Sequence, residues 1–423
     1  MNLISGEFRI MPRYCSTRSL ARRVLFLFFL FVFVAIGTPS SAIGSKAGKE
    51  PEIAEQYIKA NYITVGLENP AQVSWKKKIG ESNRFRGIPQ MNSSTPLIFG
   101  GSLYTGTSTG AFHGFKLDRG KPLWTFESES PIEAAAVANN DLVCFATLGG
   151  TLYCLDRLSG VESFNYQISS SINSAPIMDS KNIYFISTNN RLHAINLSSG
   201  KKRWSFSQKI RGKVGSRFLN TPAQSKDKLF ILLSSGDLIA LGKETGKELW
   251  RKNIFKGSDS WLVARRAPLY LDGHLYIIDK DGAVVVLDAD SGELRVVFDV
   301  GVAVDFLVTL EHIVVATKDE LISIDMATGN TLWIESVTDG SIERIFGAGS
   351  HIYVTSSKEV ETLWIGYLKK KISYVTVFTI DDGTRVWKRK FRSGISANVA
   401  ASKEKLSILT DKGKLYVFNS RTR

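Results

Sequence analysis

The chain has 423 residues, of which 43% are hydrophobic and 22% are charged, a composition that excludes a disordered chain and allows a large core. Its formal net charge of +14 favours acidic proteins, anionic lipids or nucleic acids as partners and carries no information about the fold. Length alone suggests two or three domains, but an internal repeat changes such a count.

The N-terminal segment has the pattern of a secretory signal. Several arginines precede an apolar run at residues 24–36, and small residues follow as far as Ala42. We predict a signal peptide over residues 1–42 that is cleaved after export to the periplasm. The alternative is an uncleaved N-terminal membrane anchor, although the run is shorter than the ~20 residues that a spanning helix needs. No cysteine follows the run directly, so we expect only indirect membrane association.

A repeating unit follows a polar lead-in at residues 43–72. The segment Val73 to Ile79 resembles the outer strand of a hairpin that lacks its first half. After it, an inner strand, an apolar strand, a glycine turn, a third strand and a second glycine turn recur along the chain. The second-turn glycines are 37 to 54 residues apart, and they are Gly120, Gly160, Gly200, Gly246, Gly292, Gly329 and Gly383. A period of this size with four strands in each unit predicts a β-propeller.

The most complete copy is Gly236–Trp250, which combines an alternating strand, a tight turn at Gly246 and a second strand ending on tryptophan. Counting its copies predicts an all-β, eight-bladed propeller over residues 73–423, with four strands in each blade. The last unit lacks its outer strand, and Val73 to Ile79 is an unpaired outer strand. Pairing the N-terminal strand with the C-terminal blade closes the ring and removes an open edge.

The units resemble the PQQ-type propeller repeat, whose signature is A-x-D-x-x-T-G-x-x-x-W. The resemblance covers residues 73–423, and glycine and tryptophan keep the same offset in five units. In that family the tryptophan docks between adjacent blades. The resemblance therefore implies a structural role for Trp124, Trp204, Trp250, Trp333 and Trp387. An aspartate that ends the third strand in several units indicates a turn-forming role, as at Asp118, Asp156, Asp288 and Asp325.

The sequence offers little for catalysis. Quinoprotein dehydrogenases are longer chains with adjacent paired cysteines and a calcium site, whereas Cys144 and Cys154 are ten positions apart. The five histidines lie in separate units, and none of them pairs at metal-ligand spacing. No nucleophile elbow or phosphate loop occurs. We therefore predict no catalytic residue, no cofactor and no metal, and we keep a small PQQ-dependent quinoprotein dehydrogenase as the alternative function.

The two cysteines after the signal segment fall on consecutive predicted strands. They lie directly opposite each other if the turn Leu148–Gly150 has three residues, which makes a disulfide feasible in an oxidising compartment. Their apolar surroundings favour buried free thiols instead. We therefore favour free thiols and keep the disulfide as the alternative.

Long basic and aromatic connections between units are the best candidates for binding. They cover residues 81–87, 209–220 and 256–266, and an insertion at 356–373 separates the second and third strands of the seventh unit. In a four-stranded blade both kinds of connection emerge on one face, and loops of this kind carry binding. Arginine and aromatic side chains are favoured at protein interfaces. The predicted partner-binding residues are Arg211, Arg217, Phe218, Trp261, Arg265 and Arg266.

An exported eight-bladed propeller of this length resembles the BamB family of outer-membrane assembly subunits. The segment Ser216–Pro222 is similar to that family's partner-binding loop, and Arg217 matches it, whereas Asn220 stands where an acid is usual. The resemblance implies a monomeric, non-catalytic periplasmic scaffold that binds envelope proteins, among them the barrel-assembly machine, and no nucleic acid. The absence of a lipobox cysteine is a departure from the family.

Overall fold

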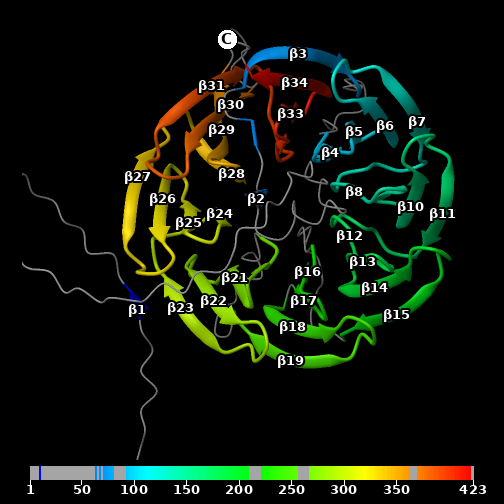
Figure 1. The fold of residues 1–423 in the computed structure, drawn as a ribbon, viewed down its shortest axis with the longest axis horizontal. Helices are drawn as coiled ribbons and strands as arrows, with labels where there is room; N and C mark the ends of the chain where they lie inside the picture. The colour runs from blue at the N-terminus through cyan, green and yellow to red at the C-terminus, as the bar shows by residue number, and fades with distance from the viewer. Residues whose placement is uncertain are drawn as a thin grey trace, which may run out of the picture.

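The computed structural model is a ring of eight four-stranded units around a central axis (Figure 1). The structure describes residues 9–10, 62–63, 66–67, 70–80, 92–208, 221–233, 235–255, 266–361 and 369–420. Within these ranges the regular elements are all β-strands. The prediction of an all-β, eight-bladed propeller with four-stranded blades is confirmed.

Each of the first four blades is an antiparallel sheet whose strands follow the chain from the axis to the rim. Blade one has β4 (Leu97–Phe99), β5 (Ser102–Gly106), β6 (Ala111–Lys116) and β7 (Pro122–Glu127). Blade two has β8 (Val137–Ala138), β9 (Leu142–Ala146), β10 (Thr151–Asp156) and β11 (Glu162–Gln167). Blade three has β12 (Ile177–Met178), β13 (Asn182–Ile186), β14 (Arg191–Asn196) and β15 (Lys202–Ser207). Blade four has β16 (Ala223–Gln224), β17 (Lys228–Leu232), β18 (Asp237–Gly242) and β19 (Glu248–Asn253).

The later blades repeat this order, and the last one takes its outer strand from the N-terminal part of the chain. Blade five has β20 (Leu269–Leu271), β21 (His274–Ile278), β22 (Val284–Asp288) and β23 (Leu294–Phe298). Blade six has β24 (Asp305–Val308), β25 (His312–Ala316), β26 (Glu320–Asp325) and β27 (Thr331–Ser336). Blade seven has β28 (Ser341–Ala348), β29 (His351–Glu361), β30 (Lys369–Thr379) and β31 (Arg385–Phe391). Blade eight has β32 (Ala400–Ala401), β33 (Lys405–Leu409), β34 (Lys414–Ser420) and β3 (Pro70–Lys78).

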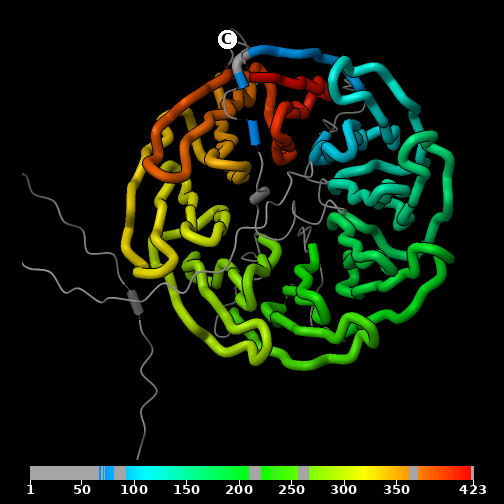
Figure 2. The backbone as a smooth tube through the Cα atoms, viewed as in Figure 1, coloured from blue at the N-terminus to red at the C-terminus, as the bar shows by residue number. Residues whose placement is uncertain are grey.

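The ring closes through β3, which pairs antiparallel with β34 over most of its length. Figure 2 shows this closure as the blue segment beside the red one. The predicted closure of the ring is confirmed. Two short strands precede β3: β1 (Arg9–Ile10) pairs parallel with β23, and β2 (Tyr62–Ile63) pairs parallel with β28. Of residues 1–72, which were predicted as signal peptide and lead-in, the structure describes 9–10, 62–63, 66–67 and 70–72, and the rest lie outside the described residues.

Burial differs systematically between the strands of a blade. The second and third strands are buried on both faces, as in β17 and β18, because each blade lies between two neighbours. Outer strands such as β15 and β19 alternate exposed and half-buried residues. The hydrophobic clusters therefore form between blades, and one of them joins Tyr184 of blade three to Leu229 of blade four.

The outer-strand tryptophans connect neighbouring blades. The indole N–H of Trp204 donates to the carbonyl of Lys243 at 3.1 Å, and that of Trp250 donates to Ala289 at 3.1 Å. The same bond runs from Trp124 to Arg157, from Trp333 to Ile380 and from Trp75 to Leu117. Trp387 packs its ring against Phe418 of blade eight, with centroids 5.5 Å apart.

The turn glycine Gly246 lies against the tryptophan of the preceding blade, Trp204. Gly246 has a φ of 67°, and a Cβ there would lie 2.5 Å from Cε3 of Trp204. Both the left-handed backbone and the close approach of the indole exclude a side chain at this position. Gly292 lies against Trp250 in the same way, so glycine and tryptophan recur together because the tryptophan of one blade covers the turn of the next.

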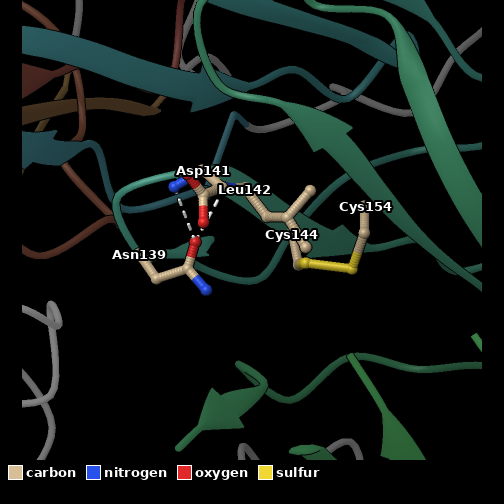
Figure 3. Close-up of a disulfide and its surroundings, with 5 residues drawn as sticks. All are labelled: Asn139, Asp141, Leu142, Cys144 and Cys154. Atoms are coloured by element: carbon tan, nitrogen blue, oxygen red, sulfur yellow. Dashed lines mark hydrogen bonds between the residues drawn. A yellow bond between two sulfur atoms is a disulfide. The ribbon is translucent and has the colours of Figure 1, made fainter. Parts of the chain in front are cut away.

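Cys144 and Cys154 form a disulfide across β9 and β10 (Figure 3). The prediction of free thiols is wrong. Thr147 and Thr151 bond across the turn, so that the turn has three residues and the cysteines are paired in direct register. Their Cα atoms are 4.1 Å apart, a separation typical of the close type of antiparallel pair. Apolar burial, which favoured free thiols, coexists with the bond.

Candidate protein-binding face

Two kinds of loop lie together on one face of the propeller. Ile132, in the connection from blade one to blade two, donates its backbone N–H to Thr107, in the turn between the second and third strands of blade one, at 3.0 Å. Thr188, in the corresponding turn of blade three, donates to Ser171 of the preceding connection at 2.9 Å. We call this surface the connection face. The opposite face carries the remaining turns, between the first and second and between the third and fourth strands.

Five of the six predicted binding residues lie outside the part of the chain that the structure describes. The positions that lie outside the described residues are Arg211, Arg217, Phe218, Trp261 and Arg265. The segments that lead into them are described. Gln208, just before the 209–220 connection, donates from Nε2 to Oδ2 of Asp237 at 3.1 Å. Phe255, just before the 256–265 segment, packs over Gly236 in the same turn.

Both connections therefore begin at one turn of blade four, on the connection face. Asp237 is the polar centre of that turn. Burial alone would raise its pKa, but hydrogen bonds from Asn253, Ser235 and Gln208 lower the pKa of this carboxyl overall. A carboxylate held in this way fixes the starting points of both loops.

Arg266 lies at the end of its connection and pairs with Asp305 rather than standing free. Its side chain is 17% exposed and that of Asp305 is 1% exposed. Asp305 also accepts the backbone N–H of Ile345 at 2.7 Å, so that the carboxylate joins blades five, six and seven. Burial and the neighbouring Arg344 lower the pKa of Arg266, and the carboxylate of Asp305 is the ion-pair partner of its guanidinium. This ion pair gives Arg266 a structural role.

The predicted insertion at 356–373 is a long β-hairpin. Strands β29 and β30 stay in register from His351 and Thr379 to Glu361 and Lys369. The inner strand β28 pairs only as far as Ser357, and the outer strand β31 only as far as Ser373. Beyond these residues the hairpin is a two-stranded ribbon with unpaired edges, which extends past the rest of blade seven on the connection face. The segment that joins its strands lies outside the described residues.

Among the described residues, no three histidine, cysteine or acidic side chains come close enough together to hold a metal ion. The disulfide joins residues ten positions apart and is buried inside blade two, in a cluster with Ile183 and Phe185. It is therefore part of a blade core rather than of a cofactor pocket.

A cleft of about 410 Å³ lies on the opposite face, between blades three and four. It is lined by Ser180, Lys181, Asn196, Ser198, Arg203 and Glu244. Arg203 and Glu244 form an ion pair across it at 3.0 Å. Sequence reasoning missed this cleft because its residues come from two blades. In the described ranges no helix has the length and apolarity to cross a membrane.

The fold and the connection face define a class: a PQQ-type repeat propeller in which two long connections and a β-ribbon start on one face. Comparison with known proteins narrows that class. The family model for outer membrane protein assembly factor BamB matches residues 65–206, 113–335 and 257–366, which together cover most of the chain. The chain belongs to this family.

Individual relatives are distant. The chain is 22% identical over 344 residues to outer membrane protein assembly factor BamB of Yersinia pestis, covering 76% of this chain and 83% of the relative. It is 29% identical over 145 residues to a quinohemoprotein alcohol dehydrogenase of Comamonas testosteroni, covering 31% of this chain and 20% of that enzyme. The crystal structure of BamB from Moraxella catarrhalis superimposes with a TM-score of 0.64 and 14% identity, covering 82% of this chain and 99% of that one. At this identity the structural match supports the fold alone.

Proposed function

We propose that the chain is a non-catalytic periplasmic scaffold that binds protein partners through its connection face during outer-membrane protein assembly. The observation that carries the proposal is that two long connections and a β-ribbon all start on that face in a member of the BamB family. Two long connections start at the same turn of blade four, and the β29–β30 ribbon extends from the same face. The opposite face has short turns that are used by the blades themselves.

Photo-crosslinking tests the proposal directly. A crosslinking amino acid replaces Arg217 or Arg265, which belong to the two connections that start on the connection face, and Lys121 or Lys201 on the opposite face serves as the matched control. We expect the positions in the two connections to capture envelope proteins that include components of the outer-membrane assembly machine. Equal capture from both faces would contradict the assignment of the face. A pull-down from envelope extract that recovers no component of that machine would contradict the assignment of the function.

The second candidate function is a small quinoprotein dehydrogenase, which the partial match to the Comamonas enzyme favours. The match covers less than a third of the chain, and the described residues lack the clustered ligands that such a cofactor needs. Adding PQQ with Ca²⁺ separates the two functions. A chromophore that stays bound through gel filtration, together with reduction of an electron-accepting dye, would favour the enzyme.

A further inference from the structure

One surface of blade seven carries four lysines around a single tyrosine. Tyr374 of β30 lies directly opposite Lys390 of β31, and Lys388 is two residues away on the same side. Alternation along the paired strands places Lys358 of β29 and Lys370 of β30 on this side too. All four lysines are exposed. We call this surface the lysine face.

The tyrosine ring holds three of these charges close together. The ammonium groups of Lys358, Lys388 and Lys390 lie 5.5, 5.3 and 6.0 Å from the ring centroid of Tyr374. Tyr374 itself is buried beneath them. The negative face of an aromatic ring attracts cations, which offsets part of the repulsion between neighbouring ammonium groups. The positive charge is therefore gathered on the folded surface before any partner arrives.

The lysine face already binds one carboxylate of the chain itself. Asp339, in the connection from blade six to blade seven, forms an ion pair with Lys388. Among the described residues no acidic side chain forms an ion pair with Lys358, Lys370 or Lys390. The surface is thus suited to carboxylates, and three of its four lysines are available to carboxylates of another chain.

The shape of the surface favours an extended polypeptide over a small anion. Val360 and Ile372 lie on the same side of the ribbon as the lysines, and Val360 is 38% exposed. Charged and apolar positions therefore alternate along the flank of a two-stranded ribbon. A flat membrane surface would touch only the end of such a ribbon, whereas an extended polypeptide segment can lie along its side.

We propose that the lysine face binds an acidic polypeptide segment of a protein partner. The inference rests on the proposed scaffold function only in taking the partner to be a protein. Carboxylate side chains of the segment pair with Lys358, Lys370 and Lys390, and its apolar side chains contact Val360 and Ile372. The binding site lies on described strands, separate from the connections at 209–220 and 256–265.

The test uses a fluorescent peptide of alternating glutamate and valine residues, its glutamine counterpart, and vesicles of phosphatidylglycerol with phosphatidylcholine. Binding to the full chain is measured by anisotropy for the peptides and by sedimentation for the vesicles. The variant K358Q/K370Q/K390Q removes the unpaired cations. The control K121Q/K201Q/K247Q removes the same charge from three exposed lysines that each follow a turn glycine on the opposite face.

We expect the glutamate peptide to bind and the glutamine peptide to bind far more weakly. Loss of three exposed ion pairs should weaken the glutamate peptide about tenfold, and added salt should remove the difference. The control variant should stay within about twofold of the wild type, since it leaves the lysine face intact. Equal losses in both variants, equal binding of both peptides, or binding of vesicles without the peptide would overturn the proposal. Crosslinking at Arg217 and Arg265 tests the scaffold function independently of these outcomes.

Discussion

The contact between a turn glycine and the tryptophan of the preceding blade allows a quantitative test. Substituting alanine for Gly246 has two costs. Its φ of 67° lies in the left-handed region, which costs a residue with a Cβ about 1–2 kcal/mol. The new Cβ would also lie 2.5 Å from Cε3 and 2.6 Å from Cδ2 of Trp204, and crowding of this kind costs a further ~1–3 kcal/mol.

Gly273 provides the matched control, because it isolates the first cost. It has a φ of 77°, and a Cβ there would have no atom within 4 Å. We therefore expect Gly273→Ala to lower the free energy of unfolding by about 1–2 kcal/mol and Gly246→Ala to lower it by about 2–5 kcal/mol. The excess of the second loss over the first measures the contact between blades three and four.

Urea unfolding followed by far-ultraviolet circular dichroism measures both losses from the transition midpoint and its slope. The variants are then repeated with Trp204→Ala in the background. If the indole is the cause, the excess cost of Gly246→Ala should largely disappear there, as coupling between contacting residues requires. Equal losses from the two glycine substitutions, or an excess that persists without Trp204, would refute the reasoning.

Three further predictions concern buried groups. Reducing the Cys144–Cys154 disulfide, which closes a short loop, should lower the free energy of unfolding by about 2–3 kcal/mol, measured by urea unfolding with and without reductant. Asp305→Ala should cost about 3–5 kcal/mol in the same assay because it leaves Arg266 buried without its carboxylate, and Asp305→Asn should cost less. Burial lowers the pKa of His193 to about 4, so its contribution to stability is present above the unfolded pKa of 6.5 and is lost as the pH falls toward 4. Wild type should therefore lose about 2 kcal/mol between pH 7 and pH 5, and His193→Gln should lose less.

The regular part of the molecule could be predicted because local chemistry repeats in it. A glycine required by a left-handed turn and a tryptophan that covers the next turn recur at one offset, as at Gly246 and Trp250. The missing outer strand of the last blade and the surplus strand at the N-terminus together predicted the closure. Trp75 in that strand donates to Leu117 as four of the predicted tryptophans do to their next blade, a role that its position in an incomplete unit had concealed.

The irregular part could not be predicted in the same way, because its contacts join residues that are distant in the sequence. The partner of Arg266 is Asp305, 39 positions away in another blade. The sequence indicates an insertion at residues 356–373 rather than two longer strands, because the lysine and glutamate residues there are poor strand formers. Pairs of opposite charge, such as Glu359 opposite Lys371, support its strands. The spacing of Lys388 and Lys390 on one strand was the available signal for the lysine face.

The turns on both faces of the propeller are fixed by repeated hydrogen bonds, whereas the connections between blades vary in length. On the opposite face, Asp156 accepts the backbone N–H groups of Leu158 and Ser159, and Asn196 does the same for its own turn. The carbonyl of Arg157 in the same turn accepts the indole N–H of Trp124. Substitutions there disturb a turn and a contact between blades together. On the connection face the turns also repeat one pattern, in which Thr107, Thr147 and Thr410 bond across their own turns. The connections between blades there differ in length from blade to blade, which is the freedom that recognition of a particular partner needs.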